Sequence, residues 1–421
     1  MSGMLPSALV LYLFNWLSAF SSLNNLSNPQ LETNELTFHL RHFHAHVGAR
    51  VLFADVFPGL LVKGNTTSEN TFTIKTRRRT THKPRSHLDF LEARRRSMIH
   101  KENVPVLWNV EEVEAPDVEH RDSLLTIAKM TYDAYLEPTD KDWYDLGGNW
   151  TDNHPFGWEP DADGFRGYVF ATEDNSTVVL SIKGTSASFL GGGGPTAKKD
   201  KLNDNLLFSC CCAHIDWTWT QVCDCYRGGW NCDFNCLQDA LVEESLFYPI
   251  GTNLYYNLTY LYPNSNIWIT GHSLGGALAS LLGVTFGAPA VTFESPGEKM
   301  ASERLHLPQP PSTQHITHIY HTADPIAMGT CTGILSSCAI AGYALESRCH
   351  LGESIVYDTI SNLSWASDVR THTIKTVIER LLSVPWAPAV EQGREVPKPQ
   401  REEDCIDCFK WEFQEPTNMT N

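Results

Sequence analysis

The sequence has few basic residues for its length. Its 421 residues include 32 Lys and Arg against 49 Asp and Glu, which gives a formal net charge of -17. Proteins that bind nucleic acid neutralise phosphates with Lys and Arg, so this charge argues against nucleic acid as a partner. The charge says little about the fold. A chain of this length can bury the core of one large domain that has extensions at its ends.

The N-terminal region lacks an apolar run of the usual membrane-spanning length. Residues 8–20 form an apolar run in which Asn15 is the most polar residue, whereas a spanning helix needs about 20 apolar residues. No Lys or Arg precedes this run, so its orientation in a membrane is poorly specified. Its length fits the core of a signal peptide, and a buried N-terminal strand or helix is the alternative.

The 12 Cys residues lack the spacing of a zinc site. Seven of them fall within a short segment without forming two clean C-x-x-C pairs; they are Cys210, Cys211, Cys212, Cys223, Cys225, Cys232 and Cys236. In the secretory pathway such residues form disulfides. Because seven is odd, at least one partner lies elsewhere or one thiol is free, and the connectivity stays open.

A second candidate metal site also lacks a recognisable spacing. Residues 38–46 contain His39, His42, His44 and His46, but no known cage has this pattern. Alternation along an extended segment explains the histidines equally well. We therefore predict no metal and no cofactor.

Sequons support entry into the secretory pathway. The pattern N-x-S/T occurs more often than chance predicts, at Asn25, Asn65, Asn149, Asn175, Asn257, Asn362 and Asn418. We predict N-linked glycosylation at Asn149, Asn175, Asn257 and Asn362.

The stretch from residue 266 to residue 287 organises the chain. Residues 267–270 predict a buried strand, and residues 276–283 predict a helix of small side chains. Between them, Gly271-His272-Ser273-Leu274-Gly275 has the form G-x-S-x-G at a strand-to-helix turn. Side chains at the two glycines would collide across such a turn, which projects Ser273 above the sheet as a nucleophile. A glycine-containing turn that happens to carry Ser is the alternative.

Strand and helix patterns alternate along much of the chain. We expect a helix from about residue 117 that Pro138 ends, strands at 164–171 and 177–182, a long helix at 239–262, and strands at 289–295 and 318–322. This order predicts an α/β fold in which a mainly parallel sheet is covered by helices on both faces. The strand ends would then bring Thr185, Ser273 and Asp324 to one edge.

Two stretches predict loops. Residues 63–96 are polar with two basic runs, 77–79 and 94–96, and predict a solvated loop, with attraction to anionic lipid headgroups as the alternative. Four consecutive glycines at 191–194 predict a flexible segment, which is either the hinge of a flap or a plain surface loop.

A nucleophilic serine needs a base, and the base needs an orienting carboxylate. In this architecture the chain order is Ser, then acid, then His. Asp324 is the leading acid because it closes a predicted strand. Glu294 is weaker because it lies within a strand pattern.

Two histidines are candidates for the base. His372 is preferred because it lies in a loop before a predicted helix at 374–382, and such a loop can reach over the sheet. Asp368 would begin this helix. His350, beside Cys349 in a disulfide-anchored loop, is the alternative. The backbone N–H of Leu274 is one predicted oxyanion donor. Thr185, through its backbone and its hydroxyl, is the other, although a plain strand terminator would look the same.

These motifs resemble those of the class 3 lipases. The resemblance is carried by GHSLGGALA at 271–279, KGT at 183–185 and ADP at 323–325, and it narrows to the fungal autophagic-body lipases through DNLLFSCCC at 204–212, TFESPG at 292–297, HTADPIAMGTCTG at 321–333, CHLGESIVYD at 349–358, residues 368–372 and CIDC at 405–408. It covers roughly residues 100–411. It implies an α/β-hydrolase fold, hydrolysis of lipid esters, and Ser273, Asp324 and His372 as the triad.

The resemblance also implies where the protein acts. We expect a single-pass type II glycoprotein, anchored by its N-terminal segment, that passes through the endoplasmic reticulum, Golgi and multivesicular bodies to the vacuole lumen. Its substrates would be phospholipids and acylglycerols in the membranes of autophagic bodies and other intravacuolar vesicles. A secreted neutral lipase or esterase, or a catalytically inactive membrane-binding glycoprotein, are the alternatives.

We expect four regions along the chain. They are a signal anchor and luminal exit at 1–26, a luminal region at 27–100, the lipase domain at 101–384, and a Pro-rich tail with a C-x-x-C motif at 385–421.

Overall fold

The computed structural model describes residues 34–47, 50–55, 72–136, 140–144, 165–172, 174–185, 197–215, 220–244 and 247–414. One compact unit begins at Glu35. The predicted N-terminal apolar run, the glycine-rich segment 191–194 and the sequon at Asn149 lie outside the described residues. Within those residues, every helix is too short or too polar to cross a membrane.

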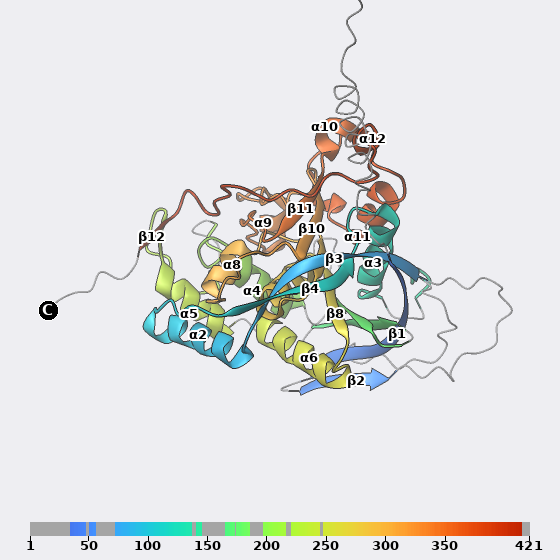
Figure 1. Cartoon of the computed structure of the whole chain (residues 1–421). Coiled ribbons are helices and arrows are strands. Elements are labelled where there is room, and N and C mark those ends of the chain that lie inside the picture. Colours follow the sequence, from blue (N-terminus) through green and yellow to red (C-terminus); the bar gives the residue numbers. More distant parts are fainter. Residues whose placement is uncertain are drawn as a thin grey trace, which may run out of the picture. The chain divides into compact units, whose positions relative to one another are not determined.

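The described chain alternates strands and helices over most of its length (Figure 1). The strands are β1 (Asn34–Val47), β2 (Arg50–Asp55), β3 (Phe72–Pro84), β4 (Trp108–Pro116), β5 (Arg166–Thr172), β6 (Thr177–Ile182), β7 (Asn231–Asp233), β8 (Asn266–His272), β9 (Ala290–Phe293), β10 (Ile316–His321), β11 (Glu353–Tyr357) and β12 (Glu412–Gln414). The helices are α2 (His87–His100), α3 (Arg121–Asp133), α4 (Ala197–Phe208), α5 (Phe234–Glu244), α6 (Phe247–Leu261), α7 (Leu274–Phe286), α8 (Lys299–Arg304), α9 (Ser337–Ala341), α10 (Thr359–Leu363), α11 (Ile374–Thr376) and α12 (Ala387–Val390), with a 3₁₀ turn η3 (Val369–Thr371) and a π-helical turn η4 (Val377–Leu381).

One large sheet forms the centre of the fold. Its strand order is β11-β10-β9-β8-β6-β5-β1-β3-β4, with β2 paired to β1. Strands β6, β8, β9, β10 and β11 are parallel neighbours, whereas β5 pairs antiparallel with both β6 and β1. The parallel half follows from the crossover helices that join its strands. Because parallel strands end at the same edge, this half gathers the loops after β6, β8, β9 and β10.

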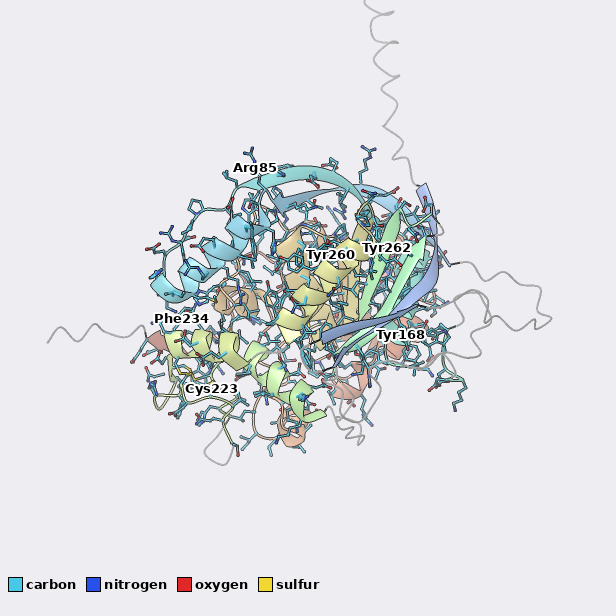
Figure 2. All side chains as sticks on the ribbon, turned by 90° about the horizontal axis from the view of Figure 1, so that it is seen from below. Arg85, Tyr168, Cys223, Phe234, Tyr260 and Tyr262 are labelled. Atoms are coloured by element: carbon cyan, nitrogen blue, oxygen red, sulfur yellow. A yellow bond between two sulfur atoms is a disulfide. The ribbon has the colours of Figure 1, made fainter. Side chains whose placement is uncertain are left out.

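Helices cover both faces of the parallel half. Apolar side chains of α4, α6 and α7 share one buried core with the sheet, and those of α3, α11 and η4 share another. Figure 1 shows α6 on one side of the strands and α3 with α11 on the other. Near the end of α6, Tyr260 is exposed and Tyr262 is buried (Figure 2). The predicted α/β-hydrolase fold is confirmed.

The prediction of a solvated loop over residues 63–96 is wrong for the part that the structure describes. Residues 72–84 form β3, which pairs antiparallel with β4, and residues 87–100 form α2. The basic side chains are tolerated because acidic partners lie opposite them. Arg77 pairs with Asp117 and Glu119, and Arg79 pairs with Glu353. Polarity in this stretch therefore reflects ion pairing on a strand.

The predicted long helix over residues 239–262 is also wrong, because the segment holds two helices. α5 ends at Glu244 and α6 begins at Phe247. Pro249 lies in the first turn of α6, where its missing N–H does no harm. The ring of a proline clashes with the carbonyl four residues earlier, so a continuous helix through this point is disfavoured.

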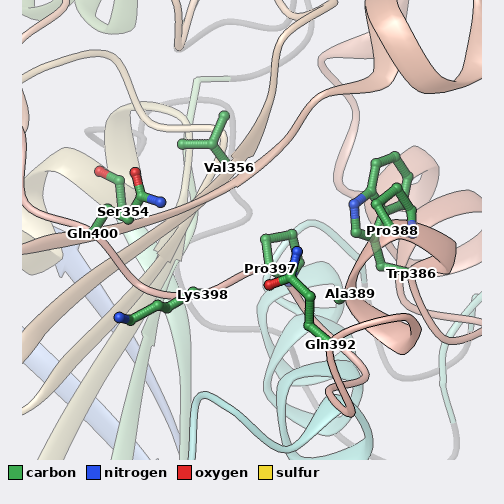
Figure 3. A pocket seen from close by; sticks show the side chains of 9 residues that line it. All are labelled: Ser354, Val356, Trp386, Pro388, Ala389, Gln392, Pro397, Lys398 and Gln400. Atoms are coloured by element: carbon green, nitrogen blue, oxygen red, sulfur yellow. The ribbon is translucent and has the colours of Figure 1, made fainter.

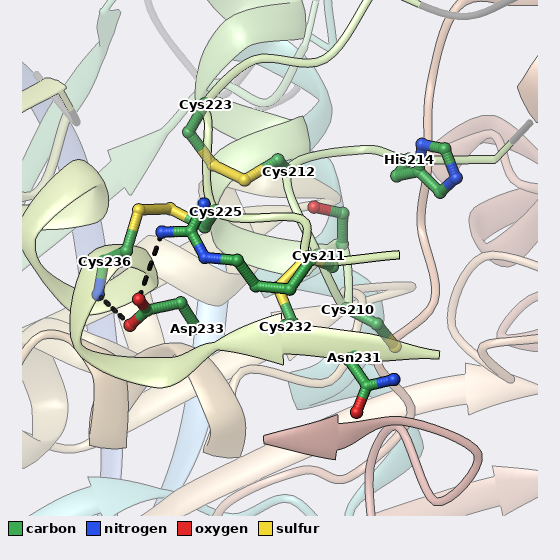
Figure 4. The surroundings of a disulfide bond; sticks show 12 residues. Cys210, Cys211, Cys212, His214, Cys223, Cys225, Asn231, Cys232, Asp233 and Cys236 are labelled. Carbon is green, nitrogen blue, oxygen red and sulfur yellow. Dashed lines mark hydrogen bonds and ion pairs between the residues drawn. A yellow bond between two sulfur atoms is a disulfide. The ribbon is translucent and has the colours of Figure 1, made fainter. Parts of the chain in front are cut away.

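All 12 Cys residues form disulfides. The Cys-rich segment contains Cys211–Cys232, Cys212–Cys223 and Cys225–Cys236, and the remaining bonds are Cys210–Cys408, Cys331–Cys338 and Cys349–Cys405. Figure 4 shows the segment, in which the Asp233 carboxylate accepts the backbone N–H of Cys236. The odd count of seven is resolved by Cys408, which lies 198 residues from its partner.

The C-terminal tail is bound to the rest of the fold. Both Cys residues of its C-x-x-C motif pair with distant partners, and β12 forms a parallel pair with β7. At the other end, β3 and α2 belong to the same compact unit as the parallel strands of the sheet. The expected boundary between residues 100 and 101 stays a prediction, and β3 and β4 pair across it.

Candidate active site

Ser273 occupies a strained turn between β8 and α7. Its backbone angles are φ 57° and ψ -130°, a conformation that is unfavourable for a side chain with a Cβ. A Cβ on Gly271 would lie 2.2 Å from the carbonyl oxygen of Gly275, and one on Gly275 would lie 2.3 Å from that of Ile182. Only glycine fits at either position, which explains the G-x-S-x-G spacing.

Backbone hydrogen bonds hold this turn in place. The N–H of Ser273 donates to the carbonyl of Phe293 on β9 at 3.0 Å. The carbonyl of Ser273 accepts from the N–H groups of Gly276 and Ala277 at 2.9 and 3.1 Å. The serine thus faces the edge where β6, β8 and β10 end, and its exposed fraction is 8%.

The structure brings Ser273, His372 and Asp324 together. His372 Nε2 lies 2.9 Å from Ser273 Oγ, and His372 Nδ1 lies 2.7 Å from Asp324 Oδ2. These distances match a hydroxyl that donates to an imidazole, which in turn donates to a carboxylate. All three residues are 8% exposed or less.

Asp324 follows β10 and is fully buried. Its second carboxylate oxygen, Oδ1, accepts the backbone N–H of Ile326 at 2.9 Å. Burial alone would raise the pKa of Asp324, but the charge and hydrogen bond of His372 outweigh it and lower the pKa to about 2. Asp324 is therefore ionised and ready to orient the imidazole.

His372 is held by a loop that folds back on the end of β10. The N–H of Asp368 and the hydroxyl of Thr371 both donate to the carbonyl of Ala323, at 3.1 and 3.2 Å. The expectation that Asp368 begins the following helix is wrong, because its carboxylate caps the short turn η3. Thr373 caps α11 in its place.

His350 does not lie at Ser273. Its Nδ1 lies 2.7 Å from Glu402 Oε1, and its Nε2 lies 3.0 Å from the carbonyl of Ser295. Burial lowers the pKa of His350, but the hydrogen bond and charge of Glu402 outweigh it and raise the pKa above its usual value. Both ring nitrogens are engaged, so the alternative base is excluded in this structure.

The two predicted oxyanion donors flank the serine. Leu274 is the first residue of α7, so its N–H is not used within the helix. Thr185 follows β6 at the same edge. Its hydroxyl donates to Asp204 Oδ2 at 2.6 Å, so its role as an oxyanion donor stays a prediction. The backbone N–H of Thr185 is the second donor that it offers, and Asp204 of α4 is a site residue that the sequence did not reveal.

A buried chain of hydrogen bonds joins the oxyanion segment to the histidine loop. The hydroxyl of Tyr135 accepts from Gly184 N–H at 3.1 Å and lies 2.7 Å from His272 Nδ1. His272 Nε2 lies 2.7 Å from the carbonyl of His372. Burial lowers the pKa of His272 to about 3, so the ring is neutral. Nε2 must then carry the proton, and Nδ1 accepts from Tyr135.

Two cavities near the C-terminal segment do not contain the triad. One cavity of about 220 Å³ lies between β11, α12 and residues 397–400 (Figure 3). Another, of about 440 Å³, lies between the Cys-rich segment and residues 408–411. Neither is lined by a triad residue.

No thiolate is available for a metal in the Cys-rich segment of the described chain. The sulfur atoms of Cys212, Cys223 and Cys225 lie within 4.8 Å of one another. Each of them is bonded in a disulfide, so disulfides account for the cluster.

The described sequons differ in exposure. Asn175 and Asn362 are exposed, and Asn257 on α6 is half-buried. Glycosylation at these positions stays a prediction.

Comparison with known proteins adds to this geometry. The family model described as Lipase (class 3) matches residues 245–330. A protein of Cryptococcus neoformans var. neoformans serotype D (strain B-3501A), named "Putative lipase ATG15", is 51% identical over 366 residues, which cover 73% of this chain and 70% of that protein. A protein of the same name from Mycosarcoma maydis is 45% identical, covering 74% and 69%.

Among solved structures, the nonglycosylated LIP2 lipase of Yarrowia lipolytica is similar with a TM-score of 0.28 and 17% identity, covering 55% of this chain and 77% of that one. That similarity is too low to support an argument. The fold, the site and the family match together define a class 3 lipase, a hydrolase that acts on ester bonds. Within this class, the chain belongs to the family of lipases named ATG15.

Proposed function

We propose that the protein is a serine lipase that hydrolyses carboxylic esters of phospholipids and acylglycerols. The observation that carries this proposal is the relay from Ser273 Oγ to His372 Nε2 at 2.9 Å and from His372 Nδ1 to Asp324 Oδ2 at 2.7 Å. A hydroxyl, an imidazole and a buried carboxylate in this order suit acyl transfer through a serine ester.

Acylation starts when Ser273 Oγ attacks the ester carbonyl carbon and His372 Nε2 accepts the hydroxyl proton. Asp324 keeps the imidazole in the tautomer whose Nε2 is free to act as the base, and it stabilises the imidazolium. The tetrahedral intermediate collapses, and His372 returns the proton to the departing alcohol. The acyl group is then bonded to Ser273.

The developing oxyanion needs donors that are already oriented. The N–H groups of Leu274 and Thr185 suit this role, and each is expected to contribute roughly 10²-fold or more to the rate. A water molecule, deprotonated by His372, then attacks the acyl-serine through a second oxyanion intermediate. Fatty acid leaves and the serine is restored.

We further propose that the substrates lie in membranes of intravacuolar vesicles, including autophagic bodies and multivesicular-body vesicles, in the vacuole lumen. The name ATG15 of the relatives supports the autophagic role, and the resemblance of residues 100–411 to autophagic-body lipases supports the vacuole. Six disulfides and several sequons support passage through the secretory pathway. Membrane association through the N-terminal segment, as a type II protein, belongs to the same proposal.

The test is fatty-acid release by purified wild type and Ser273→Ala from two substrates. These are vesicles of phosphatidylcholine with phosphatidylserine, and a triacylglycerol emulsion. The proposal expects release from both with wild type and a loss of at least about 10³-fold with Ser273→Ala. Binding of vesicles without release by the folded wild type would favour an inactive membrane-binding protein. Activity recovered from cells mainly in the medium would contradict the vacuolar location.

A further inference from the structure

Glu294 is a buried carboxyl group beside the triad to which the mechanism above gives no role. It follows β9 directly and adopts φ 43°, a backbone conformation that non-glycine residues rarely occupy. Its N–H donates to the carbonyl of Ile319 on β10 at 2.9 Å, and its exposed fraction is 0%. Glu294 and Asp324 follow the parallel neighbours β9 and β10, so both residues lie at the same edge of the sheet.

The two oxygens of Glu294 have different surroundings. Oε2 accepts the backbone N–H of His321 at 3.4 Å. Oε1 is buried, and no N–H or hydroxyl of the described chain donates to it. His321 Nε2 lies 3.7 Å from Oε1, but it is committed to the carbonyl of Thr371 at 3.2 Å. A bare carboxylate oxygen in this position would carry a large desolvation cost.

The side chains of Glu294 and Asp324 lie close enough for a hydrogen bond, which shifts the pKa of both carboxyl groups. Two carboxylates cannot make such a bond unless one of them carries a proton. Asp324 already accepts from His372 Nδ1 and from Ile326 N–H, both of which stabilise its negative form. The proton therefore belongs on Glu294.

We propose that Glu294 is a neutral positioning residue whose carboxylic acid O–H donates to Asp324 and fixes the carboxylate that orients His372. This inference rests on the proposed serine-hydrolase function of the same site. The proton on Glu294 supplies Asp324 with a third donor, so the carboxylate is held without a second negative charge beside it.

The electrostatics agree with this geometry. Burial, followed by the charge and hydrogen bond of Asp324, raises the pKa of Glu294 well above its usual value, against the opposing hydrogen bond from His321. His321 itself stays neutral, because burial lowers its pKa. The titratable groups that face Glu294 or its partner Asp324 come from β8, β10, the loop after β10 and the loop before α11; they are His272, Tyr320, His321, Asp324 and His372. Arg380 of η4 acts on His321.

The proposal predicts opposite behaviour for two substitutions. Glu294→Gln keeps a neutral donor of the same length, so the pH dependence of kcat/KM stays as in wild type. Glu294→Leu removes the donor, which makes the Asp324 carboxylate more basic and strengthens its hold on a protonated His372. The acid limb of kcat/KM then moves to higher pH by roughly one unit.

The experiment is the pH profile of kcat/KM on a soluble short-chain ester for wild type, Glu294→Gln and Glu294→Leu. Glu346→Leu is the matched control, because it also removes a largely buried carboxyl group whose pKa is raised by burial. The Glu346 carboxylate accepts a hydrogen bond from Cys210 N–H, away from the triad. An acid limb of Glu294→Gln that moves to lower pH would show that Glu294 is ionised, and it would overturn the proposal. An unmoved limb in Glu294→Leu, with only lower stability, would reduce Glu294 to a structural group and would also overturn it.

A second readout does not depend on activity. The imidazole resonances of His372, identified by their loss in His372→Gln, are titrated by NMR in the same variants. The proposal expects equal His372 pKa values in wild type and Glu294→Gln and a higher value in Glu294→Leu. If wild type shows no Ser273-dependent hydrolysis, the proposed function fails, and this titration still decides whether Glu294 acts on Asp324 and His372 as proposed.

Discussion

His272 Nε2 donates a hydrogen bond of 2.7 Å to the backbone carbonyl of His372. The residue that precedes the nucleophile thus fixes the backbone of the base, 100 positions further along the chain. Tyr135 extends this link to Gly184, beside the oxyanion donor Thr185. The positions of the base and of the oxyanion segment are therefore coupled through one buried tyrosine hydroxyl.

Tyr135→Phe is expected to weaken both stability and catalysis. It leaves the N–H of Gly184 and Nδ1 of His272 without their partner, which costs about 1–3 kcal/mol of unfolding free energy. Urea unfolding and kcat on a soluble ester measure the two effects. Tyr260→Phe is the control, because Tyr260 is 84% exposed, and it should change stability by less than about 0.5 kcal/mol. Equal values for both variants would show that the Tyr135 link is unimportant.

Gly275→Ala is expected to prevent the turn at Ser273 from forming. The added Cβ would lie 2.3 Å from the carbonyl oxygen of Ile182 and 2.8 Å from backbone atoms of Lys183, so the loss of stability should exceed about 3 kcal/mol. Gly333→Ala is the control, because it tests the effect of backbone strain without a steric clash. Gly333 has φ +87°, and a Cβ added there would meet nothing within 4 Å among the described residues, so about 1–2 kcal/mol is expected. Thermal unfolding of both variants tests the difference.

Glu294→Gln is expected to change how stability depends on pH. Because the folded pKa of Glu294 is raised above its unfolded value of 4.5, the stability it provides is fully present below pH 4.5 and is lost as pH rises. Asp324, lowered from 3.8 to about 2, contributes in the opposite sense: its stabilisation is present above pH 3.8 and lost as pH falls toward 2.

Between pH 4.5 and 6.5, wild type should therefore lose stability relative to Glu294→Gln by up to about 1.4 kcal/mol per pH unit. Urea unfolding at pH 4.5, 5.5 and 6.5 measures the difference. Glu391→Gln, at an exposed position after α12, should run parallel to wild type. A constant difference between wild type and Glu294→Gln across this range would mean that Glu294 holds no extra proton in the folded chain.

Removing the Cys210–Cys408 disulfide should cost more stability than removing Cys331–Cys338. The first joins residues 198 apart and the second residues 7 apart. Loop-closure entropy predicts that the two disulfides contribute about 5 kcal/mol and about 2 kcal/mol to the free energy of unfolding, respectively. The first value is an upper limit, because other disulfides join residues within this loop and shorten it. Paired Cys→Ser variants, compared by denaturant unfolding, test this order. Equal losses would show that strain or local packing, and not chain entropy, determines how much stability each disulfide contributes.

The sequence motifs around Ser273 predicted the nucleophile turn because contacts between neighbouring residues determine its geometry. Gly271, Ser273 and Gly275 are forced by one turn, and Asp324 and His372 follow from strand order and chain order. Strands such as β8 and β9 were visible as buried apolar runs, and the α/β fold followed from their alternation with helices.

The missed features depend on contacts between distant segments. Tyr135 falls in the segment before Pro138 that was predicted as a helix, and its hydroxyl finds its partners only in the folded chain. The carboxyl groups of Asp204 and Glu294 likewise acquire their roles only where Thr185 and Asp324 meet them. β3 was missed because its arginines are paired with acids that lie far along the chain. Those partners become visible only once the sheet has formed.

Whether Ser273 is the activated nucleophile is decided by identifying the residue that reacts with a fluorophosphonate, a reagent that modifies a serine only when a base activates it. We predict, by mass spectrometry of the digested chain, one phosphonyl adduct on Ser273 in wild type. The adduct should be lost in a folded His372→Gln variant and kept in His350→Gln. An adduct on another residue, or one on Ser273 that survives His372→Gln unchanged, would contradict the assignment of the triad.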